Sequence, residues 1–363
     1  MALTGNNLIL QNRVPIPIGL PFSNPRSKPI VSTSQSNPPL PLLHCNHRPT
    51  SLSCTENSAV SDGVSTSSSS SSIWSQFAAN VSGEWDGYGA DFTSEGKPIE
   101  LPESVVPEAY REWEVKVFDW QTQCPTLAQP NQLLMTHKTI KLLPTVGCEA
   151  DAATRYSINE RVVGGLDNKV SAFAYKSSGS YVAVWPIHDN QFELEHCLIN
   201  PQDKESRVRI IQIVDLDNRN MRLKNIRVFC EQWYGPFRNG DQLGGCAIRD
   251  TAFASAPALE ASQVVGLWQG PRLFATYDTS QTGFLQELKD ESIQKSVIDE
   301  HNIILLPKQL WCSVKGSSNG ETCCEAGWLF DYGSAITSRC IFSSNVKLKE
   351  ISLARETATT QGV

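Results

Sequence analysis

Apolar and polar residues alternate with a period of two along much of the chain after residue 85. Val170–Tyr175 and Tyr181–Trp185 flank a short turn that contains Gly179, and Trp113–Val117 alternates apolar with charged residues. A period of two places successive side chains on opposite faces of a strand. These segments are therefore predicted to be β-strands, and the first two are predicted to form a hairpin.

The same pattern predicts about nine strands before residue 233 and a second series after residue 263. A helical spacing occurs where Ile73, Phe77 and Val81 follow one another at intervals of four, which predicts one or two helical turns. The remaining predicted strands are Phe192–Ile199, Arg207–Asp215, Arg222–Gln232, Leu267–Tyr277, Phe284–Leu288, Ile303–Leu306, Leu310–Val314, Thr322–Phe330, Ser338–Ser343 and Val346–Glu356.

The chain contains an internal repeat. The pattern V-x-G-x-W-x-G occurs at Val81–Gly87 and again at Val264–Gly270, 183 positions later. Further matches keep the same order along the chain, and they indicate two copies of one β-rich unit. The matched pairs are Ile140–Pro144 with Ile303–Pro307, Glu195 with Glu325, Arg209 with Arg339, Asn220–Ile226 with Asn345–Ile351, and Glu231 with Glu356.

The repeat predicts a division of the chain into two barrels. Trp85 and Glu231 are 146 positions apart in the first copy, and Trp268 and Glu356 are 88 positions apart in the second, so the second barrel is expected to be smaller or partly completed by the first. The predicted parts are a leader (1–54), a Ser-rich linker (55–72), a first barrel (73–233), a linker (234–263), a second barrel (264–356) and a tail (357–363).

The leader differs in composition from the rest of the chain. Residues 1–54 are rich in Ser, Pro and Asn, with Arg13, Arg26, Lys28 and Arg48 as their basic residues and no Asp or Glu. This composition is typical of a chloroplast transit peptide, and an ordinary disordered tail is the alternative. No second, apolar signal for the thylakoid lumen follows, so the expected location is the chloroplast stroma.

Charge and apolar content exclude several classes of function. The leader contains four of the 31 basic residues, so the rest of the chain has 27 basic and 38 acidic residues, a formal net charge of −11. Nucleic acids and anionic lipids are poor partners for so acidic a chain. No apolar run reaches the roughly 18–20 residues that span a bilayer, so no transmembrane segment is expected.

The cysteines and histidines do not predict a metal site. Nine of the eleven cysteines lie after residue 54, and none of them forms a C-x-x-C pair. Buried reduced thiols are the favoured interpretation, and a redox role for Cys323 and Cys324 is the alternative. The four histidines after the leader (His137, His188, His196 and His301) do not form a metal-spaced pair, so no metal or cofactor is expected.

Several motifs resemble a known superfamily. A Gly-x-Trp at the first strand, preceded by a short helix and followed by an antiparallel meander, resembles the lipocalin/calycin superfamily. Leu305–Pro307, Leu310–Ser313, Glu325–Leu329 and Leu348–Glu356 resemble a narrower calycin-like family of unknown function in cyanobacteria and plastids. That family is similar to the S- and T-type phycobiliprotein lyases, which carry a bilin to its apoprotein. The resemblance covers roughly residues 74–356, and it implies two tandem lipocalin-like antiparallel β-barrels in an all-β chain.

The resemblance implies roles for the repeated tryptophans. In calycins the Trp closes one end of the barrel, and a basic residue from the last strand packs over the indole. Trp85 and Trp268 match this Trp, and Arg355 is expected to point inward with Ile351 and Leu353 and to stack on Trp268. In the first copy the position matching Arg355 is Cys230, so Arg209 or Arg227 would have to replace it. These residues could equally stabilise the fold whatever is bound.

The repeated charged residues are the candidate ligand-binding residues. Glu195, Arg209, Glu325 and Arg339 could hold the propionates and pyrrole nitrogens of a tetrapyrrole inside a barrel of about eight strands. Exposed cross-strand ion pairs are the alternative interpretation. The sequence lacks the common hydrolase, P-loop, metalloprotease and dinucleotide-binding motifs, so no catalytic residues are assigned.

The preferred hypothesis is a non-catalytic stromal binding or chaperone protein. It would hold a hydrophobic pigment, a tetrapyrrole or a lipid-like ligand during assembly of photosynthetic complexes, and protein partners in the plastid are compatible with this role. One alternative is a lyase or isomerase that acts on a linear tetrapyrrole or related pigment. The other is a structural assembly partner whose barrels are filled by side chains.

Overall fold

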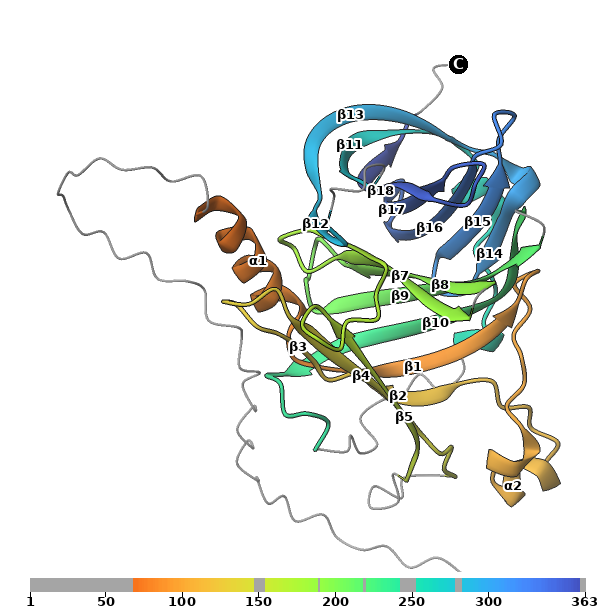
Figure 1. Cartoon of the computed structure of the whole chain (residues 1–363). Coiled ribbons are helices and arrows are strands. Elements are labelled where there is room, and N and C mark those ends of the chain that lie inside the picture. The colour runs from red at the N-terminus through yellow and green to blue at the C-terminus, as the bar shows by residue number, and fades with distance from the viewer. Residues whose placement is uncertain are drawn as a thin grey trace, which may run out of the picture. The chain divides into compact units, whose positions relative to one another are not determined.

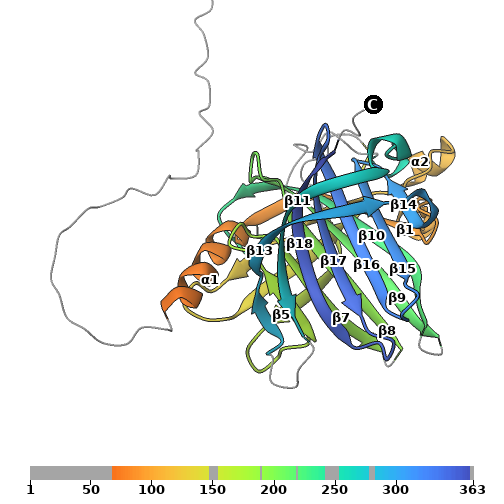
Figure 2. The same cartoon turned by 90° about the horizontal axis from the view of Figure 1, so that it is seen from above.

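The computed structural model describes residues 68–146, 154–188, 190–217, 220–241, 253–277 and 283–359. These residues form two sheets, one of eleven strands and one of seven. The first sheet curls on itself, and the second lies beside it (Figures 1 and 2). The predicted all-β fold with two barrel-like parts is confirmed. The predicted leader, residues 1–54, lies outside the described residues, as do residues 55–67 of the predicted linker.

The first sheet has the strand order β12-β6-β7-β8-β9-β10-β1-β2-β4-β3, and β5 pairs with β4. Side chains of β4 reach across the curl to β7, where the ring centres of His137 and Trp185 are 6.3 Å apart. The bounds are β1 Glu84–Thr93, β2 Trp120–Gln123, β3 Thr126–Ala128, β4 Met135–Leu142, β5 Arg155–Val163, β6 Ala172–Tyr175, β7 Tyr181–His188, β8 Gln191–Ile199, β9 Ser206–Asp217 and β10 Asn220–Gly235.

The helix α1, Ser68–Val81, packs against the curled sheet (Figure 1). Its fully buried Trp74 and Phe77 contact Tyr175 of β6, with ring centres 5.0 and 5.1 Å apart. The helix has 14 residues and is longer than the predicted one or two turns, because it begins inside the serine run.

The strand predicted at Trp113–Val117 is wrong. A short helix, α2 (Glu108–Glu112), follows the 3-10 turn η1 (Glu103–Val105), and residues 113–119, between α2 and β2, belong to no strand. Trp113 and Val115 are 62% and 46% exposed. An alternating pattern predicts a strand only where a neighbouring strand accepts its hydrogen bonds.

The second sheet has the strand order β13-β11-β18-β17-β16-β15-β14. The bounds are β11 Gly266–Thr276, β13 Lys289–Ile298, β14 Ile303–Leu306, β15 Leu310–Gly316, β16 Thr322–Asp331, β17 Ser334–Phe342 and β18 Leu348–Ala358. The edge strand β13 was not predicted. Short 3-10 turns precede β11 and β14; they are η3 Phe253–Ser255, η4 Ala261–Gln263 and η5 Glu300–Asn302.

One short strand crosses between the two copies. The strand β12, Leu285–Glu287, comes after β11 in the chain but pairs in parallel with β6 of the first sheet. Phe173 then donates its backbone N–H to the carbonyl of Phe284 at 2.6 Å. The first sheet is therefore extended by a segment of the second sequence copy.

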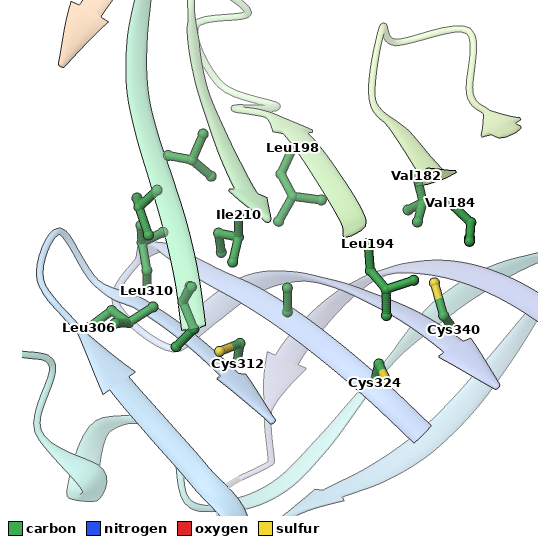
Figure 3. Packing of buried hydrophobic residues seen from close by; sticks show 14 of the residues in the cluster. Val182, Val184, Leu194, Leu198, Ile210, Leu306, Leu310, Cys312, Cys324 and Cys340 are labelled. Atoms are coloured by element: carbon green, nitrogen blue, oxygen red, sulfur yellow. The ribbon is translucent and has the colours of Figure 1, made fainter. Parts of the chain in front are cut away.

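The two sheets pack against each other through an apolar layer. Leu194, Leu198 and Ile210 of the first sheet belong to the same buried cluster as Cys312 and Cys324 of the second (Figure 3). Each sheet therefore has an interface face toward the other sheet and an inner face on its opposite side.

The repeat has a matching geometry in the two sheets. The Nε1–H of Trp85 donates to the carbonyl of Val81 at 2.9 Å, and that of Trp268 donates to the carbonyl of Val264 at 2.7 Å. Both indoles are buried. Each therefore fixes the start of its strand to the segment that precedes it. No helix in the described ranges is long and apolar enough to cross a membrane.

Candidate functional site

A buried polar network occupies the inner face of the first sheet, with Glu195 at its centre. Tyr181 Oη donates to Glu195 Oε1 at 2.9 Å, and Trp185 Nε1 donates to Oε2 at 2.9 Å. The Arg209 Nη1 lies 3.0 Å from Oε1. Because β7, β8 and β9 are consecutive neighbours in the sheet, residues of one parity on all three strands converge on the same face.

Arg209 connects this carboxylate to a second one. It donates to Glu231 through Nη2 at 2.8 Å and Nε at 3.1 Å, and its guanidinium lies over the ring of Phe229, 4.4 Å from the centroid. Arg207 donates from Nε to the same Glu231 at 2.6 Å. The predicted pair Glu195 and Arg209 is thus brought together, but the two side chains bind each other.

Arg207 is the cation that packs over Trp85. Its guanidinium lies 4.3 Å from the centre of the Trp85 ring. The prediction offered Arg209 or Arg227 for this place, but Arg209 lies over Phe229 and Arg227 pairs with Asp91 at 2.9 Å. The cation comes from β9 rather than from the last strand. In the sequence, Arg207 stands two positions before Arg209, on the same face of β9. This spacing was the signal that could have identified Arg207.

The network is balanced in charge. Arg161 of β5 adds a third guanidinium and contacts both Glu195 and Glu193. Burial raises the pKa of Glu195, but the facing His137, Arg161 and Arg209 outweigh it and hold that pKa well below its usual range. Burial lowers the pKa of His137 itself to about 3, so its ring is neutral at pH 7 and the guanidiniums supply the stabilising charge.

His137 is the one member of this cluster without a hydrogen bond among the described residues. Its ring is buried, neither nitrogen has a partner, and Nε2 lies 3.8 Å from Glu195 Oε1. No group of three or more His, Cys, Asp or Glu side chains in the described ranges is arranged to hold a metal ion.

The second sheet has a smaller network around Glu356 on its inner face. This fully buried carboxylate accepts hydrogen bonds from Arg272 at 3.0 Å, Ser296 at 2.7 Å and Thr337 at 2.6 Å. The predicted pair Glu325 and Arg339 lies on the same face, paired to each other and 12% and 14% exposed. This pair does not meet Glu195 or Arg209, because the two inner faces point away from each other.

The strand register corrects one match in the repeat. Glu231 lies opposite Arg207, and Glu356 lies opposite Ala335. Arg207 and Ala335 are therefore equivalent, and so are the residues two positions after them, Arg209 and Thr337. Thr337 donates to Glu356 as Arg209 donates to Glu231. The sequence match of Arg209 with Arg339 is displaced by two residues.

The orientation predicted for Arg355 is wrong. Arg355 is exposed, and its guanidinium lies over the ring of Phe330 at 5.6 Å rather than over Trp268. It does share a face with Ile351 and Leu353, but that face packs against the first sheet. The prediction assumed that the apolar face of the strand is the inner one, whereas the layer between the sheets is also apolar.

A groove of about 790 Å³ lies beside α1, at the edge of the first sheet. Its lining comes from α1, the loop between β3 and β4, β6, β12 and the start of β13, so both sequence copies contribute to it. Trp74, Pro130, Leu133, Tyr175 and Leu285 supply its apolar and aromatic lining, and Lys289 and Glu287 add one charge of each sign.

Comparisons with known proteins find no matching protein-family model and no matching curated protein. Solved structures found by structural comparison include a protein of unknown function from the DUF3598 family of Nostoc punctiforme. It is 14% identical with a TM-score of 0.48, covering 79% of this chain and 99% of that one. A double mutant of transferrin-binding protein B from Haemophilus parasuis is 7% identical with a TM-score of 0.15, covering 77% of each chain. Both scores are too low to carry an argument about function, and the similarity to phycobiliprotein lyases stays a sequence-based expectation.

Proposed function

We propose that this chain is a non-catalytic binding or chaperone protein for a hydrophobic ligand, held in the groove beside α1. The class of ligand is a pigment, a tetrapyrrole or a lipid-like molecule. The observation that carries this proposal is the groove itself, whose volume of about 790 Å³ falls within the range of small-molecule sites.

The chemistry of the groove fits an apolar ligand with an acidic group. The rings of Trp74 and Tyr175 and the side chain of Leu133 offer apolar contacts, and Leu133 is 55% exposed. Covering such surface contributes about 25 cal/mol per Å². Lys289 at the edge is 60% exposed on its side chain, and its ammonium lies 3.5 Å from Glu287. A propionate or fatty-acid carboxylate would share this cation with Glu287.

The buried network argues against a ligand site around Glu195 and Arg209. Glu195 and Arg209 have 0% and 1% of their side chains exposed, and they satisfy each other and Glu231. A ligand that entered there would have to break buried ion pairs, which costs several kcal/mol. The proposed site is therefore at the edge of the barrel and not around the four residues singled out from the sequence.

The cellular part of the proposal is based on the leader. The basic, acid-free composition of residues 1–54 supports import into the chloroplast. We place the protein in the stroma, where a carrier of this kind would serve the assembly of photosynthetic complexes.

The test is binding of three probes to the full chain: biliverdin, protoporphyrin IX and oleate, followed by quenching of tryptophan fluorescence and by calorimetry. At least one probe is expected to bind with a micromolar Kd, that is about −8 kcal/mol. Leu133→Arg is expected to weaken that binding at least about tenfold. Leu166→Arg is the matched control, since Leu166 is also an exposed leucine but does not line the groove. Binding unaffected by Leu133→Arg, or no binding of any probe, contradicts the proposal.

A second candidate function has its own supporting observation. The inner face of the first sheet is filled by mutually paired charges, as expected for a structural assembly partner whose barrel holds no ligand. In that case the full chain binds none of the three probes and is recovered from a plastid extract only in a larger protein complex, which native mass determination would detect.

A further inference from the structure

A second groove, of about 680 Å³, lies between the two sheets at one end of their contact. The first sheet contributes Asp86, Tyr88 and Gln232, and the second contributes Trp328. The segment that connects the sheets adds Phe253 and its neighbours. Grooves between two packed units are common places for small-molecule sites.

One polar atom in this groove lacks a partner. Asp86 lines the groove and is 6% exposed, and its Oδ1 has no hydrogen bond among the described residues. A buried carboxylate oxygen without a donor costs free energy, so native structures usually supply one. The side chain of Gln123 hydrogen-bonds to the same carboxylate, so Oδ1 is the oxygen of Asp86 that is left as an acceptor for a further donor.

The surroundings of Asp86 restrict the kind of donor. Tyr88, Phe253 and Trp328 place aromatic rings along the same groove. Aromatic rings attract cations through their faces and pack against planar apolar groups. Lys308 and Arg207 also line the groove, but Lys308 is exposed and the Arg207 guanidinium lies over the ring of Trp85.

We infer that this groove is a binding site for an aromatic molecule that carries a protonated amine, with the ammonium group donating to Asp86 Oδ1. This site is separate from the groove beside α1 in its lining residues and takes the opposite charge on its ligand.

The ionisation of Asp86 gives the site a dependence on pH. Burial and the neighbouring carboxylates of Glu84 and Glu231 together raise the pKa of Asp86 to about 6, and Gln123 and Arg238 partly offset this rise. A cation binds the ionised carboxylate more tightly than the protonated form. Binding is therefore expected to strengthen as the pH rises through about 6.

The experiment compares tryptamine with indole-3-propionate, which share the indole and the two-carbon arm but end in an ammonium and a carboxylate. Affinities of the full chain are measured by calorimetry at about pH 7.5 and pH 5. Tryptamine is expected to bind at least about tenfold more tightly than indole-3-propionate at the higher pH, and to lose about tenfold at the lower pH. Carbon-13 NMR of the Asp86 carboxyl is expected to show its pKa fall on binding.

Three variants test the residues. Asp86→Asn is expected to abolish both the preference for tryptamine and its pH dependence, and Asp217→Asn, at an exposed carboxylate, is expected to leave both unchanged. Ala258→Arg is a second block at an exposed lining position, which places a like charge in the groove without touching the core. Equal affinity for the two probes, tryptamine binding that survives both Asp86→Asn and Ala258→Arg, or no tryptamine binding up to about 1 mM overturns the inference.

Discussion

The guanidinium of Arg209 lies 3.0 Å from the carboxylate of Glu195, and only 1% and 0% of the two side chains are exposed. Taking two such charges out of water costs several kcal/mol each, and their attraction offsets that cost only with good geometry and further hydrogen bonds. Tyr181 and Trp185 supply those bonds to Glu195, and Glu231 supplies the second partner of Arg209. The inner face of the first sheet is therefore specified by polar complementarity as well as by apolar packing.

Removing one member of this network is expected to be severely destabilising. Arg209→Leu leaves Glu195 and Glu231 buried with fewer partners, so the free energy of unfolding should fall by about 3–5 kcal/mol. Urea denaturation measures it. Arg222→Leu, which removes a surface pair with Asp217 at 3.9 Å, should change stability by less than about 1 kcal/mol. An equal loss of unfolding free energy in the two variants would show that the buried ion pairs contribute no more to stability than a surface ion pair.

Stability is expected to fall on acidification, in part through His137. Burial lowers the pKa of His137 in the folded protein to about 3, whereas in the unfolded chain the imidazole keeps its ordinary pKa of 6.5. Between these values the unfolded state binds more protons, so His137 contributes stability above pH 6.5 that is lost as the pH falls toward 3. The slope is about 1.4 kcal/mol per pH unit for one proton.

His137→Gln removes this titration. Urea denaturation between about pH 6 and pH 5 should show a slope shallower than wild type by nearly one proton. Two other groups also titrate in this range: burial lowers the pKa of His196 to about 4, and the pKa of Asp86 is raised, which changes stability with pH in the opposite direction. Both groups are present in wild type and variant, so their contributions cancel when the two slopes are subtracted. Identical slopes would mean that His137 is protonated in the folded protein.

Two glycines at repeated positions should be equally intolerant of a side chain. A Cβ on Gly87 would lie 1.9 Å from the carbonyl oxygen of Cys230, and one on Gly270 would lie 2.0 Å from that of Arg355. Each Gly→Ala change must push neighbouring strands apart, and a loss of about 1–3 kcal/mol or more is expected from thermal unfolding. Gly316→Ala is the control, since its Cβ meets no atom within 4 Å. A neutral Gly270→Ala would contradict the equivalence of the two sheets.

The two sheets are expected to unfold together. Gln212 of β9 donates to the carbonyls of Ser313 and Glu325 at 3.1 and 3.3 Å, and His196 of β8 is 2.7 Å from the Ser338 hydroxyl. Gln212→Leu removes the two hydrogen bonds to the second sheet and the contact of Gln212 with His196, and it should cost about 1–3 kcal/mol without splitting the transition. Coincident fluorescence and circular dichroism curves test this. Gln294→Leu, at a surface hydrogen bond, should be neutral.

The candidate site was partly accessible from the sequence. Glu195 and Arg209 were singled out because they recur in the second copy, and they do meet in the first sheet. Arg207 and Arg161 were not singled out, because the sequence does not show which strands become neighbours. Arg161 reaches Glu195 only because the sheet curls until β5 lies near β8. The groove beside α1 could not be predicted either, since it depends on β12 crossing to β6.

Alternation of apolar and polar residues determined most of the strands, and the V-x-G-x-W-x-G repeat determined that two β-rich units follow one another. These features depend on neighbours along the chain, so they can be found in the sequence. Tertiary structure decided which face of each strand is the inner one. In β18 the sequence marks Ile351 and Leu353 as buried, but they face the other sheet, and the charged Glu356 faces inward. A period of two defines two faces without saying what covers them. The edge strand β13 shows the same limit, because its exposed charged residues become a strand only through pairing with β11.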